Sequence, residues 1–190
     1  MEKENENDDV LYNRFRHGDT AAFDALMMRH DNPLMWYLYG ILHDYQEAED
    51  MMIETFARIM VKKPHIGEGC FKAYLYKAGR NLALRVIEKK NKLDVFSLDE
   101  MTTEPVAEGT VEEQTEAAEM KELLRQCLDR IDPAQSEALY LIYYEGLSYK
   151  EAAGVMKIGV KKFDKLLQTG KKKMREELKK EGIERGDPHG

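Results

Sequence analysis

Basic and aromatic side chains are interleaved in one stretch of the sequence, AYLYKAGRNLALRVIEKK at residues 73–90. Its cations are Lys77, Arg80, Arg85, Lys89 and Lys90, and its tyrosines are Tyr74 and Tyr76. Aromatic rings accept unstacked bases while cations follow the phosphate backbone, so the pattern is typical of a site for single-stranded nucleic acid. It also fits a helix whose tyrosines lie in or beside a protein core. The residues alone leave both interpretations open.

A second group of hydrogen-bond donors follows Val160. A helix that begins there separates an apolar stripe from a polar side. The stripe consists of Val160, Phe163, Leu167, Gly170 and Met174, and the donors centred opposite it are Lys161, Lys165, Gln168 and Lys172. Long donors can reach phosphates and base edges in the major groove, although a lysine-rich face that only meets solvent is the commoner case. A helix-turn-helix pattern precedes this helix, with small Ala152 and Ala153 where two helices must approach closely, and it favours DNA binding.

Enzymatic chemistry finds little support in the sequence. Five histidines are scattered along the chain: His17, His30, His43, His65 and His189. There is no nucleophile constellation, phosphate-binding glycine loop or metal-binding spacing such as His-Glu-x-x-His. Cys70 and Cys127 lie far apart without partners at ligand spacing, so neither a disulfide framework nor a zinc site is indicated. We therefore expect no enzyme activity, no catalytic residue, no cofactor and no metal.

The elements that position these groups are expected to be helices throughout, because apolar residues recur three and four apart with little alternation. In the first half, Gly18 and Asp19 indicate a helix end followed by an N-cap. Asp44 with Glu47 forms a capping-box pattern at the start of the helix YQEAEDMMIETFARIM. Pro64, Gly67 and Gly69 then interrupt the chain. The helix after this break has a predicted inward stripe of Phe71, Leu75, Ala78, Leu82 and Val86.

The second half predicts a helix at about residues 117–130 and another over 133–144, the latter started by Pro133. Ser148 should cap the next, short helix, with Glu151 at the capping-box position. A break at residues 157–159 then leads into the helix that begins at Val160.

Charge is distributed unevenly along the chain, whose formal net charge is -7. Residues 91–119 hold 1 Lys+Arg against 9 Asp+Glu, whereas residues 120–190 hold 15 against 12. The acidic stretch contains Pro and Gly without a sustained apolar period, which is typical of a flexible linker. We expect two small helical domains, residues 1–92 and 119–182, the second containing the helix-turn-helix, joined by an acidic linker at 93–118 and followed by a disordered tail at 183–190.

The N-terminus, MEKENENDDV, is acidic, and no stretch approaches the roughly 20 apolar residues that a membrane-spanning helix needs. With so few cysteines, a reducing cytoplasm is the expected setting.

The order of four segments is informative: GDTAAFDAL, AEDMMIETF, FKAYLYKAGRNLAL and, after the acidic stretch, LSYKEAAGVMKIGV. Over about residues 10–178 the chain resembles bacterial extracytoplasmic-function (ECF) sigma factors, a group of the sigma-70 family of RNA polymerase initiation factors. The resemblance implies a cytoplasmic, two-domain, all-helical protein that binds core RNA polymerase and directs it to promoter DNA, in duplex and single-stranded form. It also implies an anti-sigma protein as a partner.

The resemblance assigns roles to individual positions. Asp50, Ile53 and Glu54 fall where the family contacts the polymerase clamp helices, and Ile53 stands where the family usually has glutamine. The loop from about Lys62 to Cys70 and the helix after it match the element that captures a base of the minus-ten promoter region. This implies minus-ten contacts from Lys72, Tyr76, Lys77, Arg80 and Asn81. The helix-turn-helix matches the reader of the minus-thirty-five region, which implies contacts from Lys161, Lys162, Lys165, Gln168 and Lys172.

Two other functions remain open. A helix-turn-helix regulator that binds duplex DNA alone would explain the lysine-rich face but not the first half of the chain. A sigma-like protein that occupies polymerase without initiating would explain the departures from the family pattern. Tyr74 stands where the family often has tryptophan, and Lys157 stands where it usually has a turn glycine. The resemblance therefore implies a positive φ in this turn, at Lys157 despite its Cβ or at Gly159.

Overall fold

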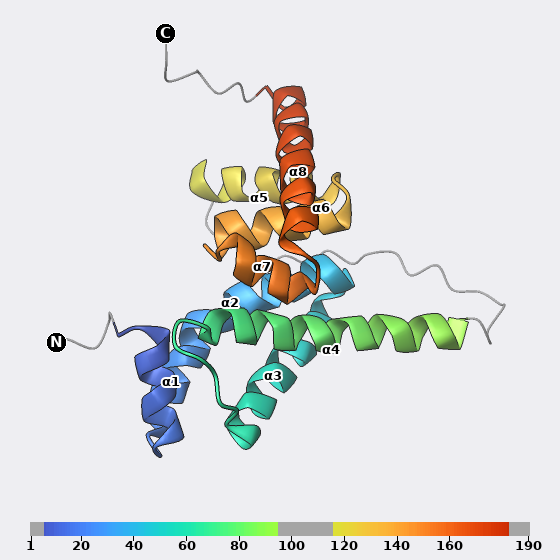
Figure 1. Ribbon diagram of the computed structural model, residues 1–190. Helices are drawn as coiled ribbons and strands as arrows, with labels where there is room; N and C mark the ends of the chain where they lie inside the picture. Colours follow the sequence, from blue (N-terminus) through green and yellow to red (C-terminus); the bar gives the residue numbers. More distant parts are fainter. Residues whose placement is uncertain (1–5, 95–115, 183–190) are drawn as a thin grey trace, which may run out of the picture. The chain divides into compact units, whose positions relative to one another are not determined.

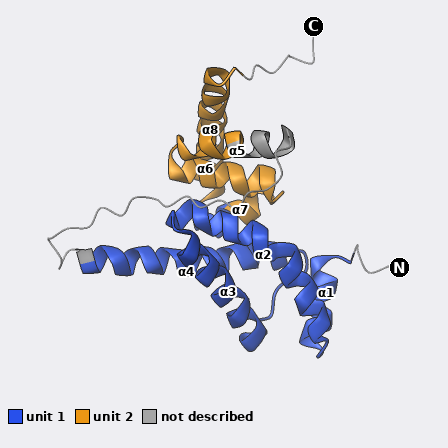
Figure 2. Cartoon of the chain, turned by 180° about the vertical axis from the view of Figure 1, so that it is seen from behind, with its two compact units in different colours: residues 1–105, 153–157 blue, residues 106–152, 158–190 orange. Residues whose placement is uncertain are grey.

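The computed structural model describes residues 6–94 and 116–182, and within these ranges the chain is helical and has no strand (Figure 1). This confirms the predicted all-α fold. Contacts divide the chain into two compact units, residues 1–105 with 153–157 and residues 106–152 with 158–190 (Figure 2). None of the described helices is both long and apolar enough to cross a membrane.

Most of the predicted linker and the whole predicted tail at 183–190 lie outside the described residues. Both ends of the predicted linker are helical, since the fourth helix continues to Asp94 and the next begins at Glu116. The domain boundaries proposed from the sequence therefore remain predictions.

The described part of unit 1 contains α1 (Asp8–Arg16), α2 (Thr20–Leu42), α3 (Tyr45–Lys62) and α4 (Phe71–Asp94). Its helix starts follow the sequence signals. Gly18 adopts a φ of 108° between α1 and α2, and the Asp19 side chain accepts from the backbone N–H of Ala22. Asp44 caps α3 by accepting from the N–H of Glu47 at 2.9 Å. Glu47 does not complete a capping box, because its carboxylate lies 2.7 Å from Lys90 Nζ of α4.

Aromatic rings form the core of unit 1. Phe15 stacks on Phe23 with centroids 4.4 Å apart, and Phe23 meets Phe56 of α3 edge-on at 6.2 Å. Phe71, the first residue of α4, lies 5.1 Å from the Tyr12 ring of α1. This chain of rings joins all four helices, so the short α1 is part of the core.

The buried face of α4 differs from the predicted stripe. Phe71, Leu75 and Leu82 are buried as expected, whereas Ala78 and Val86 are only half-buried. The other buried positions are Tyr76, Gly79 and Ala83. A Cβ added at Gly79 would lie 3.2 Å from Leu34 Cδ1 and 3.4 Å from Thr55 Oγ1, so α4 approaches α2 and α3 closely there. This contact sets the rotation of α4 about its axis.

Asp8 ties the start of α1 to α2. Its Oδ1 accepts from Arg29 at 2.6 Å, and its Oδ2 lies 2.8 Å from Nε2 of the buried His30. Burial raises the pKa of Asp8, but hydrogen bonds and charges from His30 and Arg29 outweigh it and lower the pKa overall.

We expect Asp8→Asn to lower the free energy of unfolding by about 2 kcal/mol at pH 7, because hydrogen bonds to charged groups contribute about 1.5–3 kcal/mol. Since the folded-state pKa lies below the unfolded one, the stabilisation is fully present above the unfolded value of about 4. It is lost as the pH falls through the folded-state pKa. Urea unfolding at pH 7 and pH 3 should therefore show a larger difference from wild type at pH 7. An equal difference at both pH values would contradict this, and Asp24→Asn on the exposed face of α2 is the control.

The described part of unit 2 contains α5 (Glu116–Asp129), α6 (Pro133–Leu139), η1 (Tyr140–Tyr144), α7 (Tyr149–Met156), which is shared with unit 1, and α8 (Val160–Lys180). The predicted helix over 133–144 is present, but its last turn, η1, is a π-helix. Tyr140 and Tyr144 stack there with centroids 5.0 Å apart. Lys171 of α8 lies 5.5 Å from the centre of the Tyr143 ring.

Two local features shape the turns on either side of α7. Ser148 and Glu151 form the predicted capping box, in which Glu151 Oε2 accepts from the Ser148 N–H at 2.8 Å and Ser148 Oγ accepts from the Glu151 N–H at 3.3 Å. Lys157 takes the positive φ, at 55°, while Gly159 is extended at -70° as the N-cap of α8. A residue with a Cβ thus occupies the left-handed position, which usually costs about 1 kcal/mol or more.

The core of unit 2 lies where α8 crosses α6. Phe163, Leu167 and Gly170 are the buried residues of α8, and the Tyr149 ring at the start of α7 meets Phe163 edge-on at 5.8 Å. A Cβ on Gly170 would lie 3.2 Å from the backbone oxygen of Gln135 in α6. The lysine-rich side of α8 is therefore turned away from this core.

Candidate protein and nucleic-acid interfaces

An apolar and acidic stripe lies on the surface of α3. We define the α3 stripe as Asp50, Ile53, Glu54, Ala57, Met60 and Val61, which recur three and four residues apart on one helix face. Ile53 is 55% exposed and Val61 is 79% exposed. Exposed apolar side chains gathered on one face mark interaction sites more often than isolated ones do.

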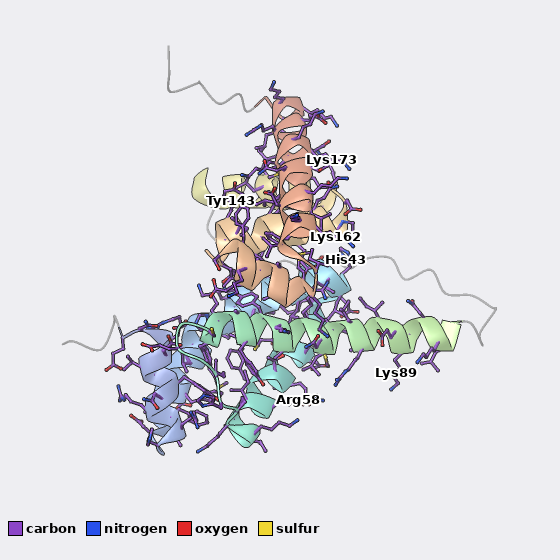
Figure 3. All side chains as sticks on the ribbon, in the orientation of Figure 1. His43, Arg58, Lys89, Tyr143, Lys162 and Lys173 are labelled. Atoms are coloured by element: carbon purple, nitrogen blue, oxygen red, sulfur yellow. The ribbon has the colours of Figure 1, made fainter. Side chains whose placement is uncertain are left out.

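The acidic members of the α3 stripe are placed differently. Asp50 is exposed, whereas Glu54 pairs with Arg58 one turn later, with 2.5 Å between Oε1 and Nε. Arg58 is labelled in Figure 3. The resemblance predicts Asp50, Ile53 and Glu54 as contact residues, but not Met60 and Val61. The same helical period, continued for two turns beyond Ile53, points to both.

The residues predicted to contact minus-ten DNA are not all at the surface of α4. Lys77 is exposed, and Lys72, Arg80 and Asn81 are half-buried. Tyr76 is 0% exposed, and its ring meets Tyr37 of α2 edge-on at 5.0 Å. The prediction that Tyr76 contacts DNA is therefore wrong for this structure, because α2 covers its side of α4.

Tyr74 is the aromatic residue of α4 that reaches the surface, with 37% of its area exposed. It shares one helix face with Lys77, Asn81 and Arg85, at spacings of three and four residues. This α4 face combines a ring, an amide and two cations, which are the groups that a single-stranded nucleic acid needs. The sequence pattern contained Tyr74 but could not separate it from Tyr76.

The loop before α4 is fixed at both ends. Lys63 ends α3 with a φ of 42°, and Gly69 adopts a φ of 73°. Cys70 donates its N–H to Gly67 at 3.1 Å, which closes a turn just before α4. We refer to residues 63–70 as the recognition loop.

Helix α1 also contacts the recognition loop. The Tyr12 hydroxyl donates to the Pro64 carbonyl at 2.7 Å, and the Gly69 N–H donates to Asp9 Oδ2. Burial raises the pKa of Tyr12 to about 12. These partners are 52 and 60 residues apart in the sequence, and no local signal could have identified them.

All predicted minus-thirty-five residues are exposed on α8: Lys161, Lys162, Lys165, Gln168 and Lys172. Figure 3 labels Lys162 together with Lys173, a further exposed lysine of the same helix. Asp164 lies among them and accepts from Gln168 Nε2 at 3.3 Å. This distance is at the long end for a hydrogen bond, so a better partner can displace it.

The residues that the structure describes contain no candidate metal site. Within residues 6–94 and 116–182, no group of three or more His, Cys, Asp or Glu side chains is arranged to hold a metal ion.

Two family models match the chain. The model described as Sigma-70 region 2 matches residues 26–93, which contain the α3 stripe and all of α4 except its last residue. The model described as Sigma-70, region 4 matches residues 121–174, which contain the helix-turn-helix and most of α8. The three candidate surfaces therefore lie within the matched segments.

Curated relatives match over most of this chain. It is 26% identical over 171 residues to the ECF RNA polymerase sigma factor SigE of Mycolicibacterium smegmatis, covering 88% of this chain and 66% of SigE. It is 25% identical over 154 residues to the ECF RNA polymerase sigma factor SigM of Bacillus subtilis, and the match covers 81% of this chain and 93% of SigM. It is 27% identical to the RNA polymerase sigma-H factor of Pseudomonas aeruginosa, and the match covers 82% of this chain and 85% of that factor.

Two solved structures share the fold. The sigma factor RpoE of Bartonella quintana, in complex with the anti-sigma factor NepR, superposes with a TM-score of 0.61 at 20% identity, over 83% of this chain and 96% of that one. CnrH, in complex with the cytosolic domain of CnrY, superposes with a TM-score of 0.62 at 21% identity, over 91% of this chain and 97% of CnrH. The chain belongs to the sigma-70 family and is an alternative sigma factor of the extracytoplasmic-function group, which directs transcription initiation.

Proposed function

We propose that this sigma factor binds core RNA polymerase through the α3 stripe and selects promoters with two separate DNA-binding surfaces. The recognition loop and α4 would take the minus-ten element, and α8 would take the minus-thirty-five element. The observation that carries the proposal is the α3 stripe, where Ile53 and Val61 are exposed beside carboxylates although the unit has a complete aromatic core. Such a surface is explained by a partner.

The α3 stripe suits a helical and basic partner surface. Residues spaced three and four apart pack into the holes of a facing helix. The carboxylates of Asp50 and Glu54 add charge complementarity, which directs association and orientation. Ile53, in place of the glutamine usual in the family, makes this contact apolar at its centre.

At the minus-ten element we propose that a base leaves the stack of opened DNA and lies against the recognition loop and the α4 face. Extrusion costs a few kcal/mol, which contacts to the base and backbone must offset. Lys77, Asn81 and Arg85 would provide backbone and polar contacts, and Tyr74 takes the aromatic role first given to Tyr76. Lys72 and Arg80 lie at other rotational positions of α4, and we propose that they contact the flanking phosphates.

At the minus-thirty-five element we propose that α8 enters the major groove of duplex DNA. The side chain of Gln168 can form two hydrogen bonds to a base edge. The lysines supply phosphate contacts, which position the helix without reading sequence.

Gln168→Ala should relax discrimination at one or two minus-thirty-five positions, about 5- to 150-fold, because a good base contact contributes about 1–3 kcal/mol of discrimination. Lys172→Ala should instead weaken all promoters alike, as loss of a phosphate contact does. Initiation rates on a set of single-base promoter variants separate these effects. Lys179→Ala, at the far end of α8, is the control, and unchanged preference in Gln168→Ala would remove this residue from the readout.

We extend the proposal to an anti-sigma partner. RpoE was solved in complex with the anti-sigma factor NepR, and CnrH was solved in complex with the cytosolic domain of CnrY. The exposed apolar residues of the α3 stripe would need cover when polymerase is absent. A factor that works on polymerase acts in the cytoplasm and needs no catalytic group of its own.

Permanganate footprinting on a promoter fragment tests the proposal. Thymines near minus ten should become reactive only when this protein and core polymerase are both present. Protection of duplex DNA by the protein alone would favour the independent helix-turn-helix regulator. Polymerase binding without any opened promoter would favour the protein that occupies polymerase without initiating.

A further inference from the structure

The recognition loop is held against one face of α1 by four contacts. Two of them reach backbone groups of the loop, from the Tyr12 hydroxyl to the Pro64 carbonyl and from Asp9 Oδ2 to the Gly69 N–H. Two involve side chains, since Lys63 Nζ lies 4.7 Å from the centre of the Phe15 ring and Arg16 Nη1 lies 3.2 Å from His65 Nδ1. Positions 9 and 12 are three residues apart, and positions 15 and 16 follow position 12 at three and four residues, so all four contacts come from one side of α1.

The two backbone contacts are not needed to complete the core. The Tyr12 ring packs on Phe71 at 5.1 Å and on Phe15 at 6.0 Å, which a phenylalanine would do equally well. The hydroxyl adds only the bond to Pro64. Asp9 is in the first turn of α1, and its carboxylate bonds the Gly69 N–H. The Tyr12 hydroxyl and the Asp9 carboxylate therefore fix the backbone path of the recognition loop.

Helix α1 is itself fixed, so it can act as a support. Asp8 bonds Arg29 and His30 of α2, and Arg14 Nη2 lies 2.6 Å from Asp19 Oδ2. Bonds to backbone groups of the loop define its course without using its side chains, and Glu68, for example, is exposed. A loop ordered in advance loses less conformational freedom when it binds, and it discriminates better between ligands of similar size.

We propose that Asp9 and Tyr12 are positioning residues for minus-ten selection, which hold the recognition loop in the shape that accepts one promoter base without touching DNA themselves. This inference rests on the proposed function, in which the recognition loop takes an unpaired base. It assigns a role in promoter specificity to the first helix of the chain, whose residues 8–16 precede the segment matched by the region 2 model.

The first test uses the free, full-length protein. Asp9→Ala should accelerate hydrogen exchange of the Gly69 amide at least about tenfold, measured by NMR, while amides in the middle of α2 keep their wild-type rates. Tyr12→Phe removes the hydroxyl and keeps the ring, and it should raise exchange at the loop amides with little change in melting temperature. Wild-type exchange at Gly69 in Asp9→Ala would overturn the proposal.

The second test measures promoter selection by the polymerase complex formed with the full chain. The double variant Asp9→Ala/Tyr12→Phe should lose about three- to tenfold of its discrimination among minus-ten base substitutions. Its discrimination among minus-thirty-five substitutions and its affinity for core polymerase should be unchanged. Tyr45→Phe, which removes an exposed hydroxyl elsewhere in unit 1, is the matched control.

The two tests separate positioning from general stability. A merely structural role would lower initiation on every promoter by one factor, and that result would overturn the proposal, as would unchanged minus-ten discrimination in the double variant. A wild-type complex that responds to minus-thirty-five but ignores minus-ten substitutions would refute the proposed function of the loop and this inference with it.

Discussion

Ile53→Lys is expected to lower the affinity of this protein for core RNA polymerase about 30-fold or more, which corresponds to the loss of a central interface residue worth about 2 kcal/mol. Ile53 lies in the middle of the α3 stripe and is exposed, so the substitution leaves the core of unit 1 intact. It replaces an apolar contact with a cation that must be desolvated beside a partner surface expected to be basic. Asp50→Lys should act in the same direction with a smaller effect, because rim charges contribute less.

The matched control is Met28→Lys. Met28 is an apolar residue of α2 that is 81% exposed and does not belong to the α3 stripe. Titration of labelled protein with core polymerase should give wild-type affinity for Met28→Lys and a large loss for Ile53→Lys, with equal melting temperatures. Wild-type affinity in Ile53→Lys would exclude the α3 stripe as the polymerase contact.

Gly170→Leu is expected to destabilise unit 2 by about 3 kcal/mol, at the upper end of the usual cost of overpacking a core. The reason is the close approach of α8 to α6, since even a Cβ at this position would lie 3.2 Å from both Gln135 Cβ and the Gln135 backbone oxygen. A backbone atom cannot move aside as the end of a side chain can, so the two helices must separate.

The single tryptophan of the chain makes this effect easy to localise. Trp36 is in α2 of unit 1, so its fluorescence reports on that unit, whereas circular dichroism reports on the helices of both. In urea, Gly170→Leu should shift the transition seen by circular dichroism and leave that of Trp36 in place. Equal shifts of the two transitions would mean that the substitution destabilises unit 1 as much as unit 2, which would contradict this expectation. Gly154→Leu is the control, because a Cβ there meets nothing within 4 Å.

The local features of the fold could be predicted because their partners are close in sequence. Asp44 caps α3 through the N–H of Glu47, and Ser148 and Glu151 cap each other over the same distance of three residues. The turn before α8 could be located but not resolved, since either of two residues, Lys157 or Gly159, could supply its positive φ. In the structure Lys157 does so, and Gly159 is extended as the N-cap of α8.

The rotation of α4 could not be predicted, and it decides which tyrosine is available for DNA. The second half of this helix is apolar nearly all round, so its own pattern does not define a single inward face. The close approach at Gly79 and the Tyr37 ring of α2 bury Tyr76 and leave Tyr74 at the surface. The contacts that Asp9 and Tyr12 make with the recognition loop were hidden for the same reason, because their partners come from distant parts of the sequence.

Run-off transcription from a library of genomic fragments, with purified core polymerase in the presence and absence of this protein, tests most directly that the chain is a promoter-selective initiation factor. Transcripts that begin downstream of shared minus-ten and minus-thirty-five elements, and only when the protein is present, are the expected result. The Ile53→Lys variant should then produce few of them and Met28→Lys a normal number. An unchanged set of transcripts, with polymerase binding verified in the same reactions, would contradict the function stated here.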